Sequence, residues 1–583
     1  MSRFTARSAR AWPAALLALL ALLAVIPLVA HGCSCGHDFE FHLQSWLDAA
    51  AQFRHGIPDP AWTNSAAWNA GEPRFLFYPP LSWMLGALLT LLLPFSAVPI
   101  AFTAFALFGA AVSMYKLAQA YAPRSIAILA AAIYIASPYM LFTAFERTAY
   151  GELLAAIWLP WLLLSTLQLR PRILQIAMSL ALLWLSNAPA AVIGVYVVLI
   201  IAILRVAHAL FLRQPFAAEK LFARFAAGGA LGLALTAFYL IPAAYERRYV
   251  QVAMAIIPNM RVEDNFLFGH TGDGPHDAVL HTASLIAVVM LGVTVIALLV
   301  AWLMQRNPNH SERKTNIHTP LALLAALTVC IAFSLTPLSL PFWHHLPELA
   351  FLQFPWRMLS ILGAILALAI AFALRNVPAN KYATAVAAIV ACLFVAAMSM
   401  RDISAFRQPC EALDPPAARA QLFATHHGVE PTDEYTPTDA DNDVLRWDDP
   451  AYWLAPSPTA FAPHTVPNPA ATIVNYDTPP PIAQTVSGIA PHHLSVTLPH
   501  ADVLIFNLRD YPNWQVFRNG SLITEHLQRD DGLLAVELPS GPSDIDVHWR
   551  RSWDELTGDA ISLAALLILA IALRRSRTIK PDA

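Results

Sequence analysis

The stretch AALLALLALLAVIPLVA (residues 14–30) decides the fold, because it carries no charge and is long enough to cross a membrane as a helix. Arg3, Arg7 and Arg10 precede it, as basic residues precede the apolar core of a secretory signal peptide. The residues before Cys33 form a poor cleavage site. We therefore predict a retained first transmembrane helix, with a cleaved signal peptide as the alternative.

The composition extends this interpretation to the whole chain. Of 583 residues, 57% are hydrophobic and 13% are charged, and the mean hydropathy is +0.52. Soluble domains carry roughly a quarter charged residues, so a soluble fold is excluded. The net charge is -3 without long runs of like charge, and nothing predicts a nucleic-acid partner.

Apolar runs alternate with clusters of Lys and Arg, which favour the cytoplasmic side. This alternation predicts a polytopic α-helical protein with twelve crossings and both termini cytoplasmic. The run at 79–93 is short and is closed by Pro94, so we expect a re-entrant or interfacial helix there. The predicted crossings lie at about 12–30, 97–118, 125–143, 152–169, 173–187, 190–210, 225–243, 281–304, 319–339, 356–374, 382–399 and 558–573.

Residues 401–556 differ from the rest, being rich in Pro, Asp, Thr and His. The part up to about residue 470 is expected to be irregular, and Asn519-Gly520 predicts a type I′ hairpin in the remainder. We expect a small antiparallel β-sandwich outside the membrane. Its predicted strands are Thr472 to Tyr476, His493 to Leu498, Asp502 to Leu508, Trp514 to Arg518, Leu533 to Leu538 and Asp544 to Trp549.

Three regions follow from these patterns. Residues 1–400 form the membrane domain, which includes an external loop at 31–78 and the short helix at 79–93. Residues 401–556 form the extracytoplasmic domain. Residues 557–583 supply the final helix and a cytoplasmic basic tail.

Five cysteines are too few for a disulfide framework. Cys330 and Cys392 lie in apolar runs, which leaves Cys33, Cys35 and Cys410 in polar regions. One bridge from the Cys33/Cys35 pair to Cys410 and three unpaired thiols are both compatible with the sequence.

The first external segment places Asp38, Glu40 and His42 directly after the first helix. In a helix, Asp38 and His42 share a face at i, i+4. Such a pair can act as a base with its orienting partner, or bind a divalent cation. The alternative is an ordinary polar boundary after a transmembrane helix. The sequence does not distinguish these alternatives, so whether a divalent cation binds here, and which one, is left open.

Aromatic residues follow the acidic segment, and Trp68 and Tyr78 are prominent among them. Aromatic rings at a membrane interface are usually anchors. They also form the walls of sites for ring-shaped or lipid-attached substrates, where flat apolar faces pack against sugars. We count His37, Trp68, Tyr78 and Trp356 as candidate substrate-lining residues.

Two further external segments carry charges beside apolar helices. Arg147 and Glu152 lie in the second external turn, and Arg357 begins the tenth predicted helix. Surface snorkelling explains such charges equally well. However, the predicted topology puts them on the same side as Asp38. An Arg fork binds phosphate and a carboxylate accepts a proton, which are the parts needed for glycosyl transfer from a polyprenyl phosphate sugar.

With these residues the chain resembles the GT-C class of membrane glycosyltransferases. More narrowly, it is similar to bacterial membrane proteins labelled 6-pyruvoyl-tetrahydropterin synthase-related. The resemblance covers most of the membrane region and the external tail. The residues that carry it are His37-Asp38 with His42, Phe77-Tyr-Pro-Pro80, Arg147, Tyr150-Gly-Glu152, Phe354-Pro-Trp-Arg357, Tyr511-Pro-Asn-Trp514 and Asn519-Gly520.

The resemblance implies roles for individual residues. Asp38 would be the catalytic or metal-binding acid, Glu152 the second acidic position, and Arg357 the group near the lipid phosphate. We add Glu40 and His42 as candidate catalytic residues and Arg147 as a second phosphate-binding group. The sequence lacks the Trp-Trp-Asp-Tyr motif of oligosaccharyltransferases and an Asp-x-Asp in the second turn, which argues against peptide glycosylation and leaves metal dependence open.

We therefore expect an inverting glycosyltransferase of a bacterial inner membrane. Its partners would be a polyprenyl-phosphate-linked sugar donor, membrane lipid, and an extracytoplasmic glycan, lipid or protein acceptor. A non-catalytic lipid-glycan transporter or cell-envelope assembly component is the alternative, although no inverted repeat is visible. Pterin synthesis is a distant third, because the chain has no soluble zinc-enzyme arrangement.

Overall fold

A computed structural model describes residues 2–306, 317–378, 380–459, 472–475 and 488–578. Within these ranges, seven helices are long and apolar enough to cross a membrane, and three bent pairs bring the total to as many as ten. The protein is therefore a multi-pass membrane protein. The seven are α1 (Ser2–His31), α5 (Val98–Gln119), α11 (Ala188–Phe211), α14 (Gly274–Arg306), α17 (Leu359–Ala373) with its preceding turn η8 (Pro355–Met358), α18 (Lys381–Phe406) and α20 (Trp553–Thr578).

Each bent pair corresponds to one predicted crossing. Prolines start the second part of two pairs, at Pro138 and Pro337, because the residue before a proline disfavours helical geometry. The bends measure 42°, 73° and 95° in chain order. The pairs are α6 (Arg124–Ile135) with α7 (Pro138–Phe145), α12 (Pro215–Leu235) with α13 (Ala237–Glu246), and α15 (His318–Ser334) with η6 (Pro337–Ser339) and α16 (Leu340–His345).

Two predicted crossings, the fourth and fifth, form shorter helices. They are α8 (Tyr150–Ala155) with α9 (Trp158–Thr166), and α10 (Ile173–Ser186). A helix thus stands at every predicted crossing, but the count of twelve stays a prediction, because these two are shorter than a usual span. The short helix expected at 79–93 is α4 (Pro80–Leu92), which ends where Leu93 becomes extended.

The first external segment forms α2 (Phe39–Arg54) and α3 (Arg74–Phe77). Helix α2 lies against α4, and a Cβ added at Gly86 would lie 2.2 Å from the Trp46 ring. Only glycine permits this close approach.

The C-terminal region contains two antiparallel sheets among the described residues. One has the order β1-β4-β7 and the other β2-β3-β8-β5-β6. The strands are β1 (Tyr452–Ala455), β2 (Thr472–Asn475), β3 (His493–Leu498), β4 (Asp502–Arg509), β5 (Trp514–Arg518), β6 (Ser521–Ile523), β7 (Leu533–Leu538) and β8 (Gly541–Trp549). All six predicted strands are present, although Tyr476 lies outside the described residues. Strand β1 was not predicted, because it falls in the part expected to be irregular.

The predicted hairpin turn is confirmed. Asn519 has φ 51° and Gly520 has φ 75°, the left-handed geometry that a type I′ turn requires at both positions. The turn joins β5 to β6 and sets their register, with Arg518 opposite Ser521.

The two sheets share one apolar core, to which Phe506 and Val536 contribute from one sheet and Val516 and Ile545 from the other. Trp62 of the first external segment is buried in the same core. Its ring lies 5.5–5.8 Å from the rings of three aromatic residues, Tyr511, Trp514 and Trp549. The segments at 31–78 and 401–556, both predicted to be external, therefore pack together. The final helix begins at Trp553, four residues before the predicted boundary.

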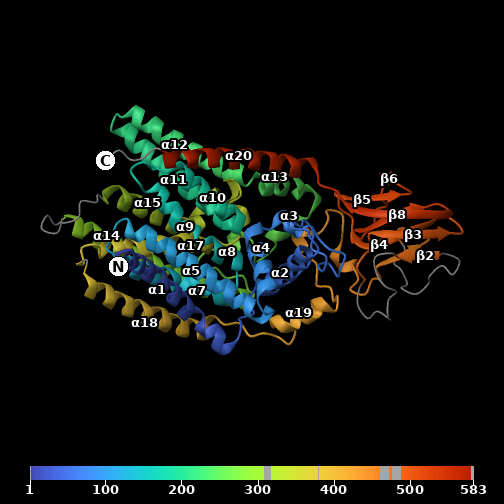
Figure 1. Cartoon of the computed structure of the whole chain (residues 1–583), viewed down its shortest axis with the longest axis horizontal. Coiled ribbons are helices and arrows are strands. Elements are labelled where there is room, and N and C mark those ends of the chain that lie inside the picture. The colour runs from blue at the N-terminus through green and yellow to red at the C-terminus, as the bar shows by residue number, and fades with distance from the viewer. Residues whose placement is uncertain (1, 307–316, 379, 460–471, 476–487, 579–583) are drawn as a thin grey trace.

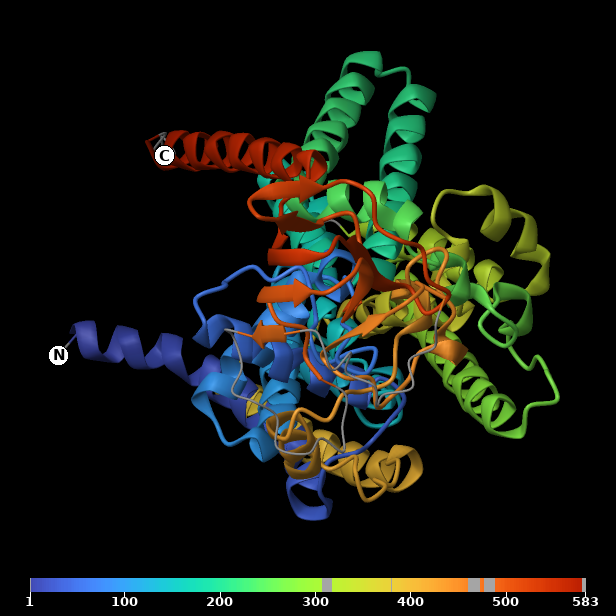
Figure 2. The ribbon, with the colours of Figure 1, turned by 90° about the vertical axis from the view of Figure 1, so that its right-hand side faces the viewer.

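Figure 1 shows the strands at one end of the molecule, with the start of α1 and the last turns of α20 toward the other end. Helices α2 and α19 (Pro416–Ala424) lie between the helical bundle and the strands. Viewed from the sheet end, the strands stand in front of the bundle (Figure 2). The segments at 31–78 and 401–556, which were predicted to be external, thus lie toward the sheet end (Figure 1). The end of the predicted basic tail, 579–583, lies outside the described residues.

Candidate functional site

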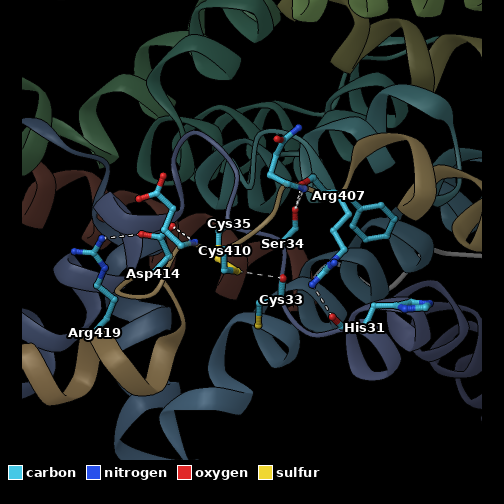
Figure 3. Close-up of a disulfide and its surroundings, with 11 residues drawn as sticks. His31, Cys33, Ser34, Cys35, Arg407, Cys410, Asp414 and Arg419 are labelled. Atoms are coloured by element: carbon cyan, nitrogen blue, oxygen red, sulfur yellow. Dashed lines mark hydrogen bonds and ion pairs between the residues drawn. A yellow bond between two sulfur atoms is a disulfide. The ribbon is translucent and has the colours of Figure 1, made fainter. Parts of the chain in front are cut away.

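The segment that carries Asp38 is anchored by a disulfide. Cys35 is bonded to Cys410, with 5.0 Å between their Cα atoms, while Cys33 is a free cysteine whose side chain points away (Figure 3). Of the two arrangements that the sequence allowed, one bridge is therefore correct. Next to it, the Ser34 hydroxyl donates to the Phe145 carbonyl at 2.5 Å and accepts from the Gln408 N–H at 2.8 Å. These bonds fix the start of the first external segment to the chain after α18 and to the end of α7.

Asp38 lies beside Arg147 because their backbones are joined. The Asp38 N–H donates to the Arg147 carbonyl at 3.0 Å, and a Cβ added at Gly36 would lie 2.0 Å from the Glu146 carbonyl oxygen. The Asp38 Oδ2 lies 3.9 Å from Nη2 of Arg147, and the Asp38 side chain is 43% exposed. The structure thus holds an accessible carboxylate against a fixed cation.

Arg147 is the buried centre of this group, with 6% of its side chain exposed. Its Nη1 donates to Glu152 Oε2 at 2.5 Å, and Tyr139 donates to the other oxygen of Glu152, also at 2.5 Å. The guanidinium lies 4.9 Å from the centre of the Trp356 ring. Burial lowers the pKa of Arg147, but Glu152, Tyr139 and Asp38 outweigh it and raise the pKa above its usual value. Arg147 therefore stays positively charged.

Arg357 supplies a second cation from the start of the tenth predicted helix. Its Nη1 donates to the Leu352 carbonyl at 2.9 Å, and its guanidinium lies 4.9 Å from the Phe354 ring centre. Its buried Nε has no hydrogen-bond partner, and no carboxylate of the described residues lies within 4.0 Å of the group. Arg357 consequently retains N–H donors that an anion could use.

Asp38, Arg147 and Arg357 line one cavity of about 640 Å³. Its walls come from the first external segment, the turn at 147–149, the facing ends of α10 and α11, helix α13, the loop at 348–357 and residues 434–435. Each of these segments was predicted to lie on the external side. A cavity of this size is typical of sites for small ligands, and these three charged side chains can bind an anion and accept a proton.

His37 and Tyr78, two of the candidate substrate-lining residues, also line the cavity. Burial lowers the pKa of His37, with Asp38 opposing that shift. Burial, helped by Asp38, raises the pKa of Tyr78, so its hydroxyl stays protonated. The Tyr78 hydroxyl lies 3.5 Å from Nε2 of His42. His42 itself is buried behind Tyr78, and burial lowers its pKa to about 4, so the imidazole is neutral.

Other candidate residues do not line the cavity. Glu40 bonds Arg419, and although burial raises its pKa, Arg419 opposes the shift. Glu152 and Trp356 are buried around Arg147. Trp68 lies in another apolar cluster, where its backbone N–H donates to the Val429 carbonyl at 2.9 Å.

Among the lining residues that were not predicted, three are polar groups from different segments. Glu434 comes from the extramembrane region, Tyr239 donates from α13 to the Phe77 carbonyl at 2.7 Å, and Asn187 caps α11 through a 2.9 Å bond from the Ala190 N–H. Only Asn187 had a signal in the sequence, since it ends the predicted crossing at 173–187, just before the next one begins at 190. No three His, Cys, Asp or Glu side chains of the described ranges gather closely enough to hold a metal ion.

Fold and site define a multi-pass membrane protein with a charged cavity and a C-terminal region of two β-sheets. No protein-family model matches the chain, and no curated protein matches it. Among solved structures it is similar to the arabinofuranosyltransferase AftD from Mycobacteria, determined by cryo-EM, with a TM-score of 0.40, 16% identity and 66% of this chain covered. A structure of an AftD mutant has a TM-score of 0.40 and 18% identity, with 67% of this chain covered.

This chain covers 27% and 28% of the length of those two AftD chains. No functional conclusion follows from so partial a likeness. The narrower resemblance to proteins labelled 6-pyruvoyl-tetrahydropterin synthase-related has no counterpart in the comparisons and stays a prediction.

Proposed function

We propose that the chain is a membrane glycosyltransferase that moves a sugar from a polyprenyl-phosphate-linked donor to an extracytoplasmic acceptor. The observation that carries the proposal is the shared cavity: the accessible carboxylate of Asp38 and the guanidinium groups of Arg147 and Arg357 line the same space. A lipid-borne phosphate needs cations near the membrane, and an acceptor hydroxyl needs a base.

Asp38 serves as the base in this mechanism. It takes the proton from the acceptor hydroxyl while the hydroxyl oxygen attacks the anomeric carbon of the sugar. The bond from that carbon to the phosphate oxygen breaks on the opposite face, and the electron pair leaves with the polyprenyl phosphate. A single displacement of this kind inverts the anomeric configuration.

Arg357 binds the phosphate through its unused N–H donors and stabilises the charge on the leaving group. Arg147 adds a second positive charge on the cavity wall. Glu152 acts through Arg147, because its carboxylate is buried against the Arg147 guanidinium, and is therefore a positioning residue. His42 orients Tyr78 from behind the wall.

The cavity faces the extracytoplasmic side of a bacterial inner membrane in this proposal, with both termini cytoplasmic. The Cys35–Cys410 disulfide supports that orientation, because structural disulfides persist in oxidising compartments and are rare in the cytosol. The disulfide lies next to the segment that carries Asp38.

The proposal is tested by Asp38→Asn in the full chain reconstituted in nanodiscs. With cell-envelope oligosaccharides present as acceptors, wild-type protein should consume at least one member of a panel of polyprenyl-phosphate-linked monosaccharides and release polyprenyl phosphate, whereas the variant should lose at least about a hundredfold in rate. Asp443→Asn, an exposed aspartate of the extramembrane region, is the matched control. Full activity of the Asp38 variant would refute Asp38 as the base, whereas a wild-type protein that consumes no donor would favour a non-catalytic transporter or assembly component.

A further inference from the structure

The extramembrane region contributes a carboxylate to the cavity. The turn η9 (Asp433–Tyr435) places Glu434 and Tyr435 in the cavity wall, together with Asp38. No role has been given to Glu434 so far. Its segment is distant from Asp38 in the sequence, so the site is complete only when the extramembrane region is docked on the first external segment.

A buried ion pair holds the residue that precedes this turn. Arg74 donates to Glu72 Oε1 at 2.7 Å, and the two side chains are 3% and 2% exposed. Both bind Thr432: Nη2 of Arg74 donates to the Thr432 hydroxyl at 3.1 Å, and Oε2 of Glu72 accepts from the Thr432 N–H at 2.9 Å. The residue two positions before Glu434 is thus fixed to the first external segment.

The residues that follow the turn are held by the segment after α13. The Gln251 N–H donates to the Thr436 carbonyl at 2.9 Å, and Val250 pairs with Pro437 in an antiparallel bridge. The Tyr435 ring stacks on Phe77, with 5.8 Å between ring centres and 8° between planes. Glu434 therefore sits in a turn that is bonded at both flanks, which is the rigidity that a recognition residue needs.

Arg247 and Glu348, which also line the cavity, pair with each other at 3.6 Å. Of the other charged groups, the cations Arg147 and Arg357 come from the ends of membrane helices, whereas the carboxylates Asp38 and Glu434 come from segments predicted to be external. No cation of the described residues lies within 4.0 Å of Glu434. Burial raises the pKa of Glu434, with Glu72 and Asp433 adding to the shift and a backbone hydrogen bond and Arg74 opposing it. Such a carboxylate gains most from a ligand that donates hydrogen bonds without bringing a negative charge.

We infer that Glu434 binds hydroxyl groups of a saccharide acceptor and so determines acceptor specificity. The inference rests on the proposed function, because it assigns the phosphate to the arginine side of the cavity and the acceptor to the extramembrane side. The stacked rings of Tyr435 and Phe77, which also line the cavity, offer an apolar surface to the C–H face of the sugar.

The test is binding of the full chain in nanodiscs to an array of cell-envelope oligosaccharides. Wild-type protein should bind at least one saccharide of the array. Glu434→Gln should bind the same saccharides at least about tenfold more weakly, the loss expected for charged hydrogen bonds. Glu430→Gln, an exposed glutamate in the same segment, should behave like wild type.

Equal binding by wild type and Glu434→Gln would overturn the inference, as would capture of no saccharide by a wild-type protein with an unchanged melting curve. Retention of undecaprenyl phosphate, measured by native mass spectrometry, separates the two proposals. If wild-type protein retained no undecaprenyl phosphate, the proposed lipid-phosphate donor would be refuted, whereas a saccharide site at Glu434 would remain. Glu434→Gln should retain the lipid as wild type does.

Discussion

Replacing Arg74 by Met should loosen the extramembrane region from the first external segment. Arg74 donates to Glu72 at 2.7 Å, to the Ser45 hydroxyl at 3.0 Å and to the Thr432 hydroxyl at 3.1 Å. Its removal leaves the Glu72 carboxylate buried without its cation. Breaking a buried ion pair on one side costs roughly 3–5 kcal/mol, because an uncompensated charge stays inside the protein.

A double-mutant cycle tests this magnitude. We expect the variant with Arg74→Met and Glu72→Met to be less destabilised than the sum of the two single variants, by at least about 2 kcal/mol, because no unpaired charge remains. The free energy of unfolding is measured by urea titration in detergent with tryptophan fluorescence, to which Trp62 contributes from the adjoining core.

The matched control is Arg446→Met. Arg446 pairs with Asp448 at 3.1 Å on the surface, with 44% and 34% of the side chains exposed, and such pairs contribute about 0–1 kcal/mol. If Arg74→Met changed the free energy of unfolding no more than Arg446→Met, the Glu72–Arg74 pair would not hold the turn that carries Glu434.

The remaining predictions concern the segment around Asp38. Because burial lowers the pKa of His42 from 6.5 to about 4, the unfolded chain binds more protons between these values, and stability should fall by up to about 3 kcal/mol as the pH drops from 6.5 to 4. Unfolding titrations across this pH range should show a flatter dependence for His42→Gln, and an unchanged slope would contradict a buried neutral imidazole. Gly36→Ala should slow transfer by roughly a hundredfold, because its Cβ would meet the Glu146 carbonyl at 2.0 Å and displace Asp38. Gly229→Ala, where an added Cβ meets nothing within 4 Å, should keep the wild-type rate, and equal rates for both variants would refute this role of Gly36.

Much of the fold could be predicted because its signals are local. Apolar runs marked the helices, and the strands predicted at His493 to Leu498, Trp514 to Arg518 and Leu533 to Leu538 have the bounds of β3, β5 and β7. The missed strand β1 is four residues long, and it pairs with a strand some fifty residues later, Tyr452 opposite Phe506. Such a pairing leaves no periodicity in the segment itself.

The candidate site was predictable only as far as the topology allowed. Asp38, Arg147 and Arg357 were expected on one side of the membrane, and they line one cavity. Glu40 was grouped with Asp38 by sequence distance, but two positions along a helix point to different faces, and its partner Arg419 comes from α19. Glu434 had no signal at all, because long-range hydrogen bonds bring its turn to the cavity.

Trp68 shows why an aromatic residue near an acidic segment is ambiguous. It lies in a run of positive φ angles from Ala67 to Asn69, and the backbone of Gly428 approaches so closely that a Cβ there would lie 2.6 Å from the Trp68 Cα. This close contact with the extramembrane region takes Trp68 away from the cavity. Only the tertiary structure distinguishes it from Tyr78, which does line the cavity.

The most direct test of the central claim is a cryo-EM structure of the full chain in nanodiscs with undecaprenyl phosphate, combined with lipid retention by native mass spectrometry. We predict phosphate density between Asp38 and Arg357, and retention at least about tenfold weaker in Arg357→Gln than in the exposed control Arg401→Gln. Phosphate bound elsewhere on the protein, or equal retention by the two variants, would contradict the account.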